Sequence, residues 1–436
     1  MLNRILIGVF CVSLVAGAYA DFPDRASLSE TGSVLIYPKV EVRWDADGKL
    51  MTDTFITLTN NGNEEIDITA YYVAEQCTSI DLHFTLTERQ PAYWSALTGQ
   101  PGPDGDALSP FTDAGDPVQP GGPGTDLILR GYLVVIATWD SDIDDEPCAV
   151  RWNKLFGEAT LVDYAAGTSM EYKAYAFAAD DGYAEKDTCI TTTGELVFDE
   201  SDYAAFPHQL LLPFYKPGTS PYGGSEAPYF TDSVITDTEL TLIIGDMDLR
   251  RIPLVDDAPG DAEVAWPWKT KVEFEIWDEN ENGHTGLDYV IPKFFSETLT
   301  NLGGSFVTLP TTAGFARIWA YDDVSDLECY VLDPFDPEGE TLLFQCIDTA
   351  LLGVAVEYVE FDGGAAYATN GGALRGTGVQ DDPDDVSIWI DYASGGGGGG
   401  DDVTDTGSMT KLNRGGASLS RSFESHAGQV TPPRDT

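Results

Sequence analysis

The chain has 436 residues, of which 42% are hydrophobic and 11% aromatic, too many for a disordered protein. Its 45 glycines, 25 prolines and 20 each of tyrosine and phenylalanine favour strands and turns over long helices. Acidic residues outnumber basic ones by 73 to 23, giving a net charge of −50 that repels phosphate backbones and anionic lipids, so the composition excludes nucleic acid as a partner.

Residues 1–20 have the features of a secretory signal peptide. A short start with Arg4 is followed by an apolar stretch at residues 5–16, and Ala18-Tyr19-Ala20 is a small-x-small cleavage site. The apolar stretch is shorter than the ~20 residues that a spanning helix needs. We therefore expect a secreted or cell-surface protein with no transmembrane segment.

Alternating apolar and polar residues predict half-buried strands at residues 39–44, 65–70 and 271–276. Turn pairs lie next to such runs, namely Asp47-Gly48, Asn61-Gly62 and Asn282-Gly283. This spacing predicts an all-β fold of antiparallel hairpins rather than strand–helix–strand units.

The strands at residues 54–63 and 66–73 resemble the hairpins that open bacterial immunoglobulin-like (Ig-like) surface modules. The resemblance covers roughly twenty residues, and the cysteine and tryptophan spacing of a true immunoglobulin domain is not evident. It implies a secreted Ig-like β-sandwich and carries no activity with it.

A weak internal repeat predicts two sandwiches in tandem. Residues 130–140 can be laid over residues 313–323, and each run enters an acidic turn and then meets a cysteine, Cys148 in the first and Cys329 in the second. Chance similarity between β-rich stretches is the alternative.

The predicted organisation has two antiparallel β-sandwich (Ig-like) domains with long loop insertions, followed by a Gly-rich linker and a disordered tail. The expected parts are a signal peptide at residues 1–20, a first sandwich at 21–199, a second at 206–392 and the linker and tail at 394–436, with insertions at 97–125, 217–232 and 256–268.

Cysteines outside the signal peptide are expected to be mostly oxidised in an exported protein, and their number is odd. Cys329 and Cys346 flank a loop and are predicted to form a disulfide across neighbouring strands. Partner choice among Cys77, Cys148 and Cys189 stays open. No cysteine or histidine spacing indicates zinc.

Acidic turns predict structural calcium, because hard oxygen ligands stand at alternate positions. The predicted ligands are Asp278, Asn280 and Asn282 in one turn, and Asp140, Asp142 and Asp144 in another. The first turn matches D-x-N-x-N-G, but its twelfth position is Tyr289 and strands precede it, so an EF-hand is not expected. The alternative is an acidic turn without an ion.

Aromatic side chains near predicted loops could stack on sugar rings. Trp266, Trp268 and Trp94 are the candidates for glycan contact. The alternative is that these rings fill the ends of the two cores, since tryptophan is highly buried on average.

Catalytic motifs are not evident in the sequence: G-x-S-x-G, H-E-x-x-H and the phosphate-binding loop are missing, and no carboxylate pair can be chosen among 73 acids. We expect a non-enzymatic extracellular surface or matrix protein, structural or adhesive, with a surface protein or extracellular polysaccharide as partner. The alternative is a carbohydrate-binding protein or glycosidase. The oligomeric state stays open.

Overall fold

The computed structural model describes most of the chain between residues 26 and 390. The described residues are 26–28, 30–75, 79–101, 107–108, 128–140, 147–179, 185–190, 194–200, 202–220, 233–249, 269–320, 328–332, 341–345, 349–361, 366–379 and 386–390. The predicted signal peptide, the linker and tail at 394–436, the insertion at 256–268 and most of the insertions at 97–125 and 217–232 lie outside them.

The described residues form strands and two single-turn helices. In chain order the elements are β1 (Val34–Trp44), β2 (Leu50–Asn60), β3 (Ile66–Ala74), β4 (Ser79–Leu86), β5 (Pro91–Ser95), β6 (Gln100–Pro101), β7 (Ala107–Leu108), β8 (Ile128–Asp140), β9 (Pro147–Arg151), β10 (Leu155–Asp163), β11 (Thr168–Lys173), β12 (Tyr175–Phe177), β13 (Glu185–Cys189), β14 (Glu195–Val197), β15 (Pro207–Tyr215), β16 (Ser233–Ile244), β17 (Met247–Asp248), β18 (Lys269–Asp278), β19 (Gly283–Pro292), β20 (Phe294–Thr298), α1 (Leu299–Leu302), α2 (Ser305–Thr308), β21 (Ala313–Ala320), β22 (Glu328–Leu332), β23 (Thr341–Gln345), β24 (Leu351–Phe361), β25 (Ala366–Ala373), β26 (Arg375–Val379) and β27 (Ser387–Trp389).

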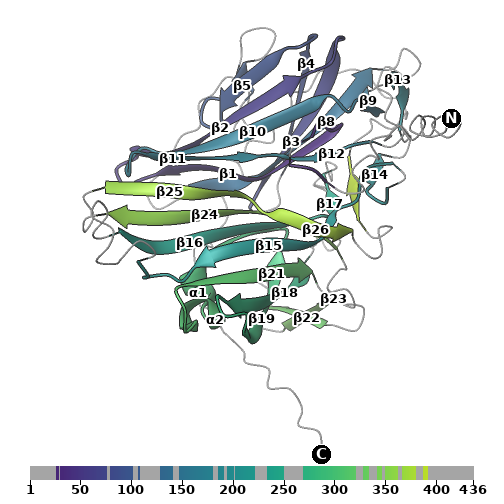
Figure 1. The fold of residues 1–436 in the computed structure, drawn as a ribbon. Helices are drawn as coiled ribbons and strands as arrows, with labels where there is room; N and C mark the ends of the chain where they lie inside the picture. Colours follow the sequence, from purple (N-terminus) through teal and green to yellow (C-terminus); the bar gives the residue numbers. More distant parts are fainter. Residues whose placement is uncertain are drawn as a thin grey trace, which may run out of the picture.

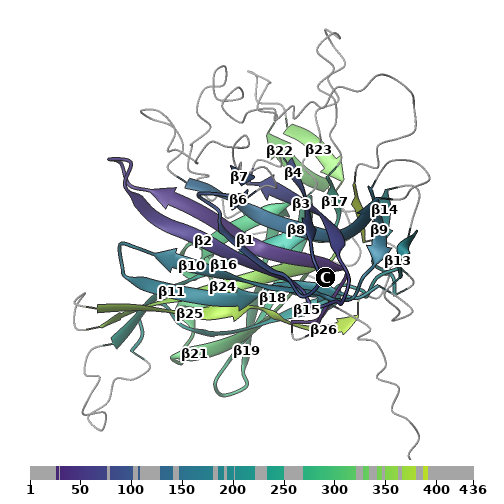
Figure 2. The same cartoon turned by 90° about the horizontal axis from the view of Figure 1, so that it is seen from above.

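Three large antiparallel sheets carry the fold (Figure 1). The first has the order β11-β10-β2-β1-β8-β3-β4, with β5, β9, β12 and β13 attached to it. The second is β20-β16-β24-β25 and the third is β19-β18-β21-β15-β26. In both views β24 and β25 of the second sheet run beside β1 and β11 of the first (Figures 1 and 2).

Two of the three predicted hairpins form as expected. Asp47-Gly48 joins β1 to β2, where Arg43 pairs with Thr52, and Gly48 has the positive φ of 79° that a tight turn requires. Asn282-Gly283 joins β18 to β19, where Trp277 pairs with Gly283. Strand β18 alternates strictly between buried and half-buried residues, as its sequence predicts.

The third predicted hairpin is wrong. Both strands exist, but β2 pairs with β1, β10 and β5, whereas β3 pairs with β4 and β8. The Asn60 side chain explains the difference: its amide donates to the carbonyl of Glu64 at 2.7 Å and its Oδ1 accepts from Trp152 Nε1 at 3.0 Å. These bonds hold the loop as a crossover between strands that are not neighbours in the sheet.

Buried hydrophobic residues form three clusters in the described part of the chain. The first core lies mainly among strands before residue 178, and the second core is built wholly from residues after 209. A third, which we call the shared core, takes residues from the segment before residue 200 and from the segment after it. We call these the first and the second segment. Members of the shared core include Val34, Ile36, Tyr175, Phe177, Phe198, Phe206, Ile243, Met247, Leu352 and Ile388.

Strand β1 is buried on both faces because it separates two of these clusters. Leu35 and Tyr37 point into the first core, whereas Val34 and Ile36 point into the shared core. The sequence of a strand that is covered on both faces is a continuous apolar run, and residues 34–37 form such a run.

The predicted boundary near residue 200 is part of the shared core. Phe198 and Phe206 are fully buried and contact each other edge-on. A small sheet closes over them, in which β27 pairs with both β14 and β17 and so links residues 195–197 to 247–248. Residues of the two predicted domains therefore pack together in one core.

The two repeat segments are both inner strands. β8 lies between β1 and β3 in the first sheet, and β21 lies between β15 and β18 in the third. The all-β class and its antiparallel sheets, which could pair into sandwiches, are confirmed. The tandem Ig-like organisation stays a prediction.

Candidate functional site: a polar junction between the sheets

The polar face of β1 is buried, unlike that of an ordinary half-buried strand. Lys39 is 1% exposed and Glu41 is 3% exposed, because β16 and β24 of the second sheet lie against this face. Buried charges are rare unless they are paired. We call Lys39, Glu41, Arg43, Glu239 and Tyr358 the polar junction.

A bulge in β1 positions Lys39. The register with β8 shifts between Tyr37 and Val40, where Pro38 has no N–H to donate. The Tyr172 hydroxyl then bonds to both backbone groups of Lys39: it donates to the carbonyl and accepts from the N–H. The lysine side chain is thereby directed toward β16.

Lys39 forms the centre of the junction. Its Nζ donates to Glu239 Oε1 at 2.8 Å and to Thr241 Oγ1 at 3.4 Å, and lies 3.5 Å from Glu41 Oε2. These contacts join a residue of the first segment to residues of the second. An ammonium group held this deeply needs both its charge and its donors satisfied.

Glu239 is satisfied at both oxygens. Oε1 also accepts from Ser296 Oγ at 2.6 Å, and Oε2 accepts from the Tyr358 hydroxyl at 2.9 Å. Burial by itself raises the pKa of Glu239, but the charge of Lys39 and the hydrogen bonds outweigh it and hold that pKa well below its ordinary value. Glu239 is therefore ionised at neutral pH.

Arg43 completes a row of alternating charges. Its Nη2 lies 2.7 Å from Glu41 Oε1, and its side chain is 39% exposed, so this row of charged side chains extends from solvent to the interior. Burial lowers the pKa of Arg43, but the nearby carboxylates of Glu41 and Glu239 outweigh it and raise that pKa. With Lys39 and Glu239, the four charges sum to zero within a protein of net charge −50.

A cavity of about 100 Å³ adjoins the junction. One wall is a row of register partners across β1, β2, β10 and β11, namely Arg43, Thr52, Asp163 and Thr168. The opposite wall is Tyr358 and its register partner Thr369, on β24 and β25. Glu41, Leu161, Met170 and Val356 complete the lining.

Four buried polar atoms at this cavity make no hydrogen bond within the protein. They are Glu41 Oε2, Arg43 Nε, Thr168 Oγ1 and Thr369 Oγ1. Such atoms are uncommon and costly, so their gathering from three strands, β1, β11 and β25, around one space distinguishes this site.

Gly371 lets the two sheets approach beside the cavity. It pairs with Val356, has a φ of +137°, and a Cβ at this position would lie 2.0 Å from the carbonyl oxygen of Ala355 and 3.2 Å from Met170 Sδ. A larger residue would clash with the β24 backbone and press on Met170 of β11.

The predicted calcium turn at residues 278–283 is closed by its own hydrogen bonds. Asp278 Oδ1 accepts from the backbone N–H groups of Asn280 and Asn282 at 2.8 and 3.0 Å, and His284 Nε2 lies 3.1 Å from Oδ2. Burial raises the pKa of Asp278, but the bonds from Asn282, His284 and Asn280 outweigh it and lower that pKa to about 2. The carboxylate is therefore ionised and already bonded.

The second predicted calcium turn is described only at its start. Asp140 ends β8 opposite Pro147, and Asp142 and Asp144 lie outside the described residues. Within the part of the chain that the structure describes, no group of three histidine, cysteine or acidic side chains is placed to hold a metal ion. Calcium at either turn stays a prediction.

Of the predicted glycan contacts, Trp94 alone is described. It is 3% exposed and packs edge-on against Phe84 in the first core. Trp266 and Trp268 lie outside the described residues. The neighbour of Trp94, Tyr93, is 76% exposed and is the more accessible ring.

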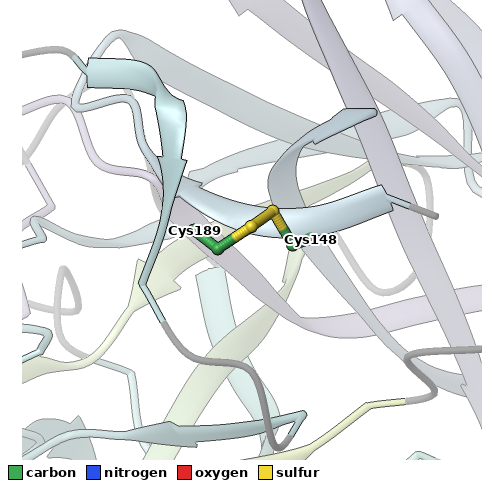
Figure 3. Close-up of a disulfide and its surroundings, with 2 residues drawn as sticks. All are labelled: Cys148 and Cys189. Atoms are coloured by element: carbon green, nitrogen blue, oxygen red, sulfur yellow. A yellow bond between two sulfur atoms is a disulfide. The ribbon is translucent and has the colours of Figure 1, made fainter. Parts of the chain in front are cut away.

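The cysteine question left open by the sequence is resolved by a disulfide between Cys148 and Cys189, which joins β9 to β13 (Figure 3). Cys77 and Cys346 lie outside the described residues. Cys329 is on β22, where its register partner is Phe344 on β23. The predicted bridge from Cys329 to Cys346 therefore stays a prediction.

Sequence reasoning missed the polar junction, because the alternation at residues 39–44 is the same for a strand that faces water and for one that faces another sheet. The available signal was Lys39 itself, which follows the doubly buried run at residues 34–37 with only Pro38 between them. Glu239, in a strand 200 residues later, could not be matched to it without the fold.

Comparisons with known proteins identify no family. No protein family model matches the chain, and no curated protein matches it. Among solved structures, a β-glucuronidase from glycoside hydrolase family 2 is matched at a TM-score of 0.12 and 10% identity, over 80% of this chain and 24% of that one. The chain spans about a quarter of that enzyme, and a TM-score this low carries no argument. No helix among the described residues is long and apolar enough to cross a membrane.

Proposed function

We propose that the chain is a non-enzymatic protein of the cell exterior, structural or adhesive, in which two Ig-like sandwich units at residues 21–199 and 206–392 act as one rigid body. The shared core is the observation that carries this proposal, because Phe198, Phe206 and residues of both units pack in it. Domains move relative to one another unless a large apolar contact holds them. A rigid body of this kind suits a component that presents surfaces or bears load.

Support for an exterior location comes from chemistry as well as from the predicted signal peptide. The Cys148–Cys189 disulfide suits an oxidising compartment. A net charge of −50 is best tolerated where salt or divalent cations screen it. Structural calcium at Asp278 belongs to the proposal and requires Asn282 to turn its amide nitrogen, 3.2 Å from both carboxylate oxygens, away from the ion.

Location and role can be tested on the producing cells. The protein should be recovered from the surface or matrix fraction with Asp21 as its first residue, and antibody fragments against it should reduce cell attachment or matrix cohesion. Recovery from the cytoplasm with residues 1–20 intact would overturn the proposal. Calcium and sodium at equal ionic strength should differ in their effect on the melting temperature if calcium is structural.

A second candidate is glycan binding, with or without glycosidase activity. Its supporting observation is an exposed aromatic face on β2 and β5: Tyr93 is 76% exposed and Phe55 is 38% exposed. Tyr93 pairs with Thr57, two residues from Phe55, so the rings are diagonal neighbours. Polysaccharide binding lost in Tyr93→Ala would favour this candidate, and release of reducing ends would favour the glycosidase.

A further inference from the structure

We propose that the cavity at the polar junction is a binding site for a neutral, hydroxyl-bearing ligand, either a small polyol or the terminal ring of a saccharide chain. This inference is independent of the exterior role proposed above, and it uses a site separate from the Tyr93 face. It stands on the position, polarity and charge balance of the groups that line the cavity.

Four buried atoms that make no hydrogen bond belong to one space, and one of them, Glu41 Oε2, also lies 3.5 Å from Lys39 Nζ. Glu41 Oε2 is an acceptor on a side chain that is 3% exposed, Arg43 Nε is a donor, and the Thr168 and Thr369 hydroxyls can act as either. All four residues line the cavity of about 100 Å³. A ligand with closely spaced polar groups could satisfy them together.

A hydroxyl group on the ligand fits the two β1 atoms, Arg43 Nε and Glu41 Oε2. A single hydroxyl can accept a hydrogen bond from Arg43 Nε and donate one to Glu41 Oε2. A carboxylate could not donate to Glu41, and an ammonium group could not accept from Arg43. An adjacent hydroxyl on the ligand could then reach Thr168 or Thr369 on the cavity walls.

The charges around the cavity also favour a neutral ligand. Arg43 is already paired with Glu41, and Lys39 with Glu239, so the junction next to the cavity is balanced. Asp163 Oδ1 accepts from the backbone N–H groups of Ala165 and Ala166, so it is engaged in its own turn. An anion would meet no free cation, and a cation would meet only Asp163, whose Oδ1 already accepts two backbone hydrogen bonds, whereas a neutral ligand leaves the Lys39, Glu41, Arg43 and Glu239 charges balanced.

The lining and the volume of the cavity limit which ligands fit. Leu161, Met170 and Val356 give the cavity an apolar side that suits the C–H face of a polyol or sugar. Since a water molecule occupies about 30 Å³ of liquid volume, a cavity of about 100 Å³ takes a small polyol or the hydroxyl-bearing edge of a terminal sugar ring rather than an entire oligosaccharide. Among the lining residues, Arg43 has a side chain that is 39% exposed, so it links the cavity wall to solvent.

Saturation-transfer NMR and calorimetric titration of the full secreted chain test the proposal. The neutral probes are glycerol, the methyl glycosides of glucose, galactose and mannose, and the corresponding trisaccharides; acetate and ammonium are the charged probes. At least one neutral probe should bind with a Kd of roughly a millimolar, as expected for a few uncharged hydrogen bonds. Trisaccharide binding would identify a chain end as the natural source, and exclusion of trisaccharides would identify a free polyol or sugar.

Matched valine variants assign the binding to the cavity. Thr168→Val and Thr369→Val keep side-chain shape and should each weaken binding by about three- to tenfold, while Thr369→Ser should retain it. The control is Thr160→Val, because Thr160 precedes Leu161 on β10 and faces away from the cavity. Unchanged melting temperatures would show that each variant is folded.

Three results would overturn the proposal: saturation transfer to none of the neutral probes at tens-of-millimolar concentration, tighter binding of acetate or ammonium than of the neutral probes, or equal Kd values for Thr168→Val, Thr369→Val and Thr160→Val. None of these results affects the exterior location, which is read from the mature N-terminus and the cell fraction. Loss of exterior location would conversely leave the titrations unchanged.

Discussion

The contact between the two segments has an apolar end and a polar end, and the two ends work differently. At the apolar end, Val34 and Ile36 of β1 meet Ile243 and Leu352 in the shared core. Five residues after Val34, Lys39 meets Glu239 at the polar end. The same strand thus joins the same two segments through hydrophobic burial at one end and through paired charges at the other.

This difference separates stability from specificity. Burial of a large aliphatic side chain contributes about 1.5–3 kcal/mol and tolerates small changes in position. A buried ion pair contributes little net free energy, because desolvation offsets attraction, but loss of one partner is costly. The apolar end therefore supplies the free energy of association, and the polar end favours one alignment of the sheets.

Removal of Lys39 should have the largest effect. Lys39→Met leaves Glu239 buried without its cation, and the free energy of unfolding should fall by about 3–5 kcal/mol. Chemical denaturation checks this value. The double variant Lys39→Met with Glu239→Leu removes both charges and should recover most of the loss. A double variant as unstable as Lys39→Met would mean that charge pairing is not what the junction provides.

Truncation at the apolar end should come next. Leu352 is fully buried in the shared core, and Leu352→Ala should lower the free energy of unfolding by about 2–5 kcal/mol through lost burial and a residual cavity. Val290→Ala is the control, because Val290 is 48% exposed and its truncation should change stability by less than about 0.5 kcal/mol. Equal effects of the two substitutions would show that burial in the shared core does not contribute to stability.

A smaller effect is expected at the edge of the junction. Tyr358→Phe deletes the hydroxyl that donates to Glu239 Oε2, and a hydrogen bond to a charged group is worth about 1.5–3 kcal/mol. Denaturation of Tyr358→Phe and of Tyr367→Phe, whose ring is 48% exposed on the neighbouring strand, gives the comparison. An equal loss in both variants would show that the specific bond from Tyr358 to Glu239 adds nothing beyond the loss of any tyrosine hydroxyl.

Acid should weaken the polar end and spare the apolar end. The folded pKa of Glu239 lies well below its ordinary value of 4.5, so its contribution to stability is present above that pH and is lost as the pH falls below it. The loss is gradual, because protonation in the folded state needs still lower pH. Stability measured from pH 6 down to pH 3 should fall less steeply in Glu239→Gln than in the parent chain. Identical slopes would show that Glu239 has no lowered pKa.

Local sequence predicted the local parts of the fold. Period-2 alternation and the Asp47-Gly48 and Asn282-Gly283 turns located β1, β2, β18 and β19, because these signals depend on neighbouring residues. The Asn61-Gly62 pair failed, since bonds from Asn60 to Glu64 and Trp152 override the hairpin preference of the dipeptide. The pairing of β27 with both β14 and β17 depends on contacts across much of the chain.

The candidate site could not be predicted for the same reason. Its walls come from β1, β2, β10 and β11 on one side and β24 and β25 on the other. Threonine at 168 and 369 carries no recognisable motif, and the four atoms that make no hydrogen bond come together only once the sheets are stacked. The acidic turn at Asp278 did carry a motif, but its carboxylate is bonded within its own turn.

We expect the shared core and the polar junction to make the two segments one cooperative body. Differential scanning calorimetry of the secreted chain tests it most directly, by comparing the calorimetric with the van't Hoff enthalpy of unfolding. We expect a single transition with a ratio near one, and a shift of that entire transition in Lys39→Met and in Leu352→Ala. Two separate transitions, with each substitution moving only one of them, would contradict it.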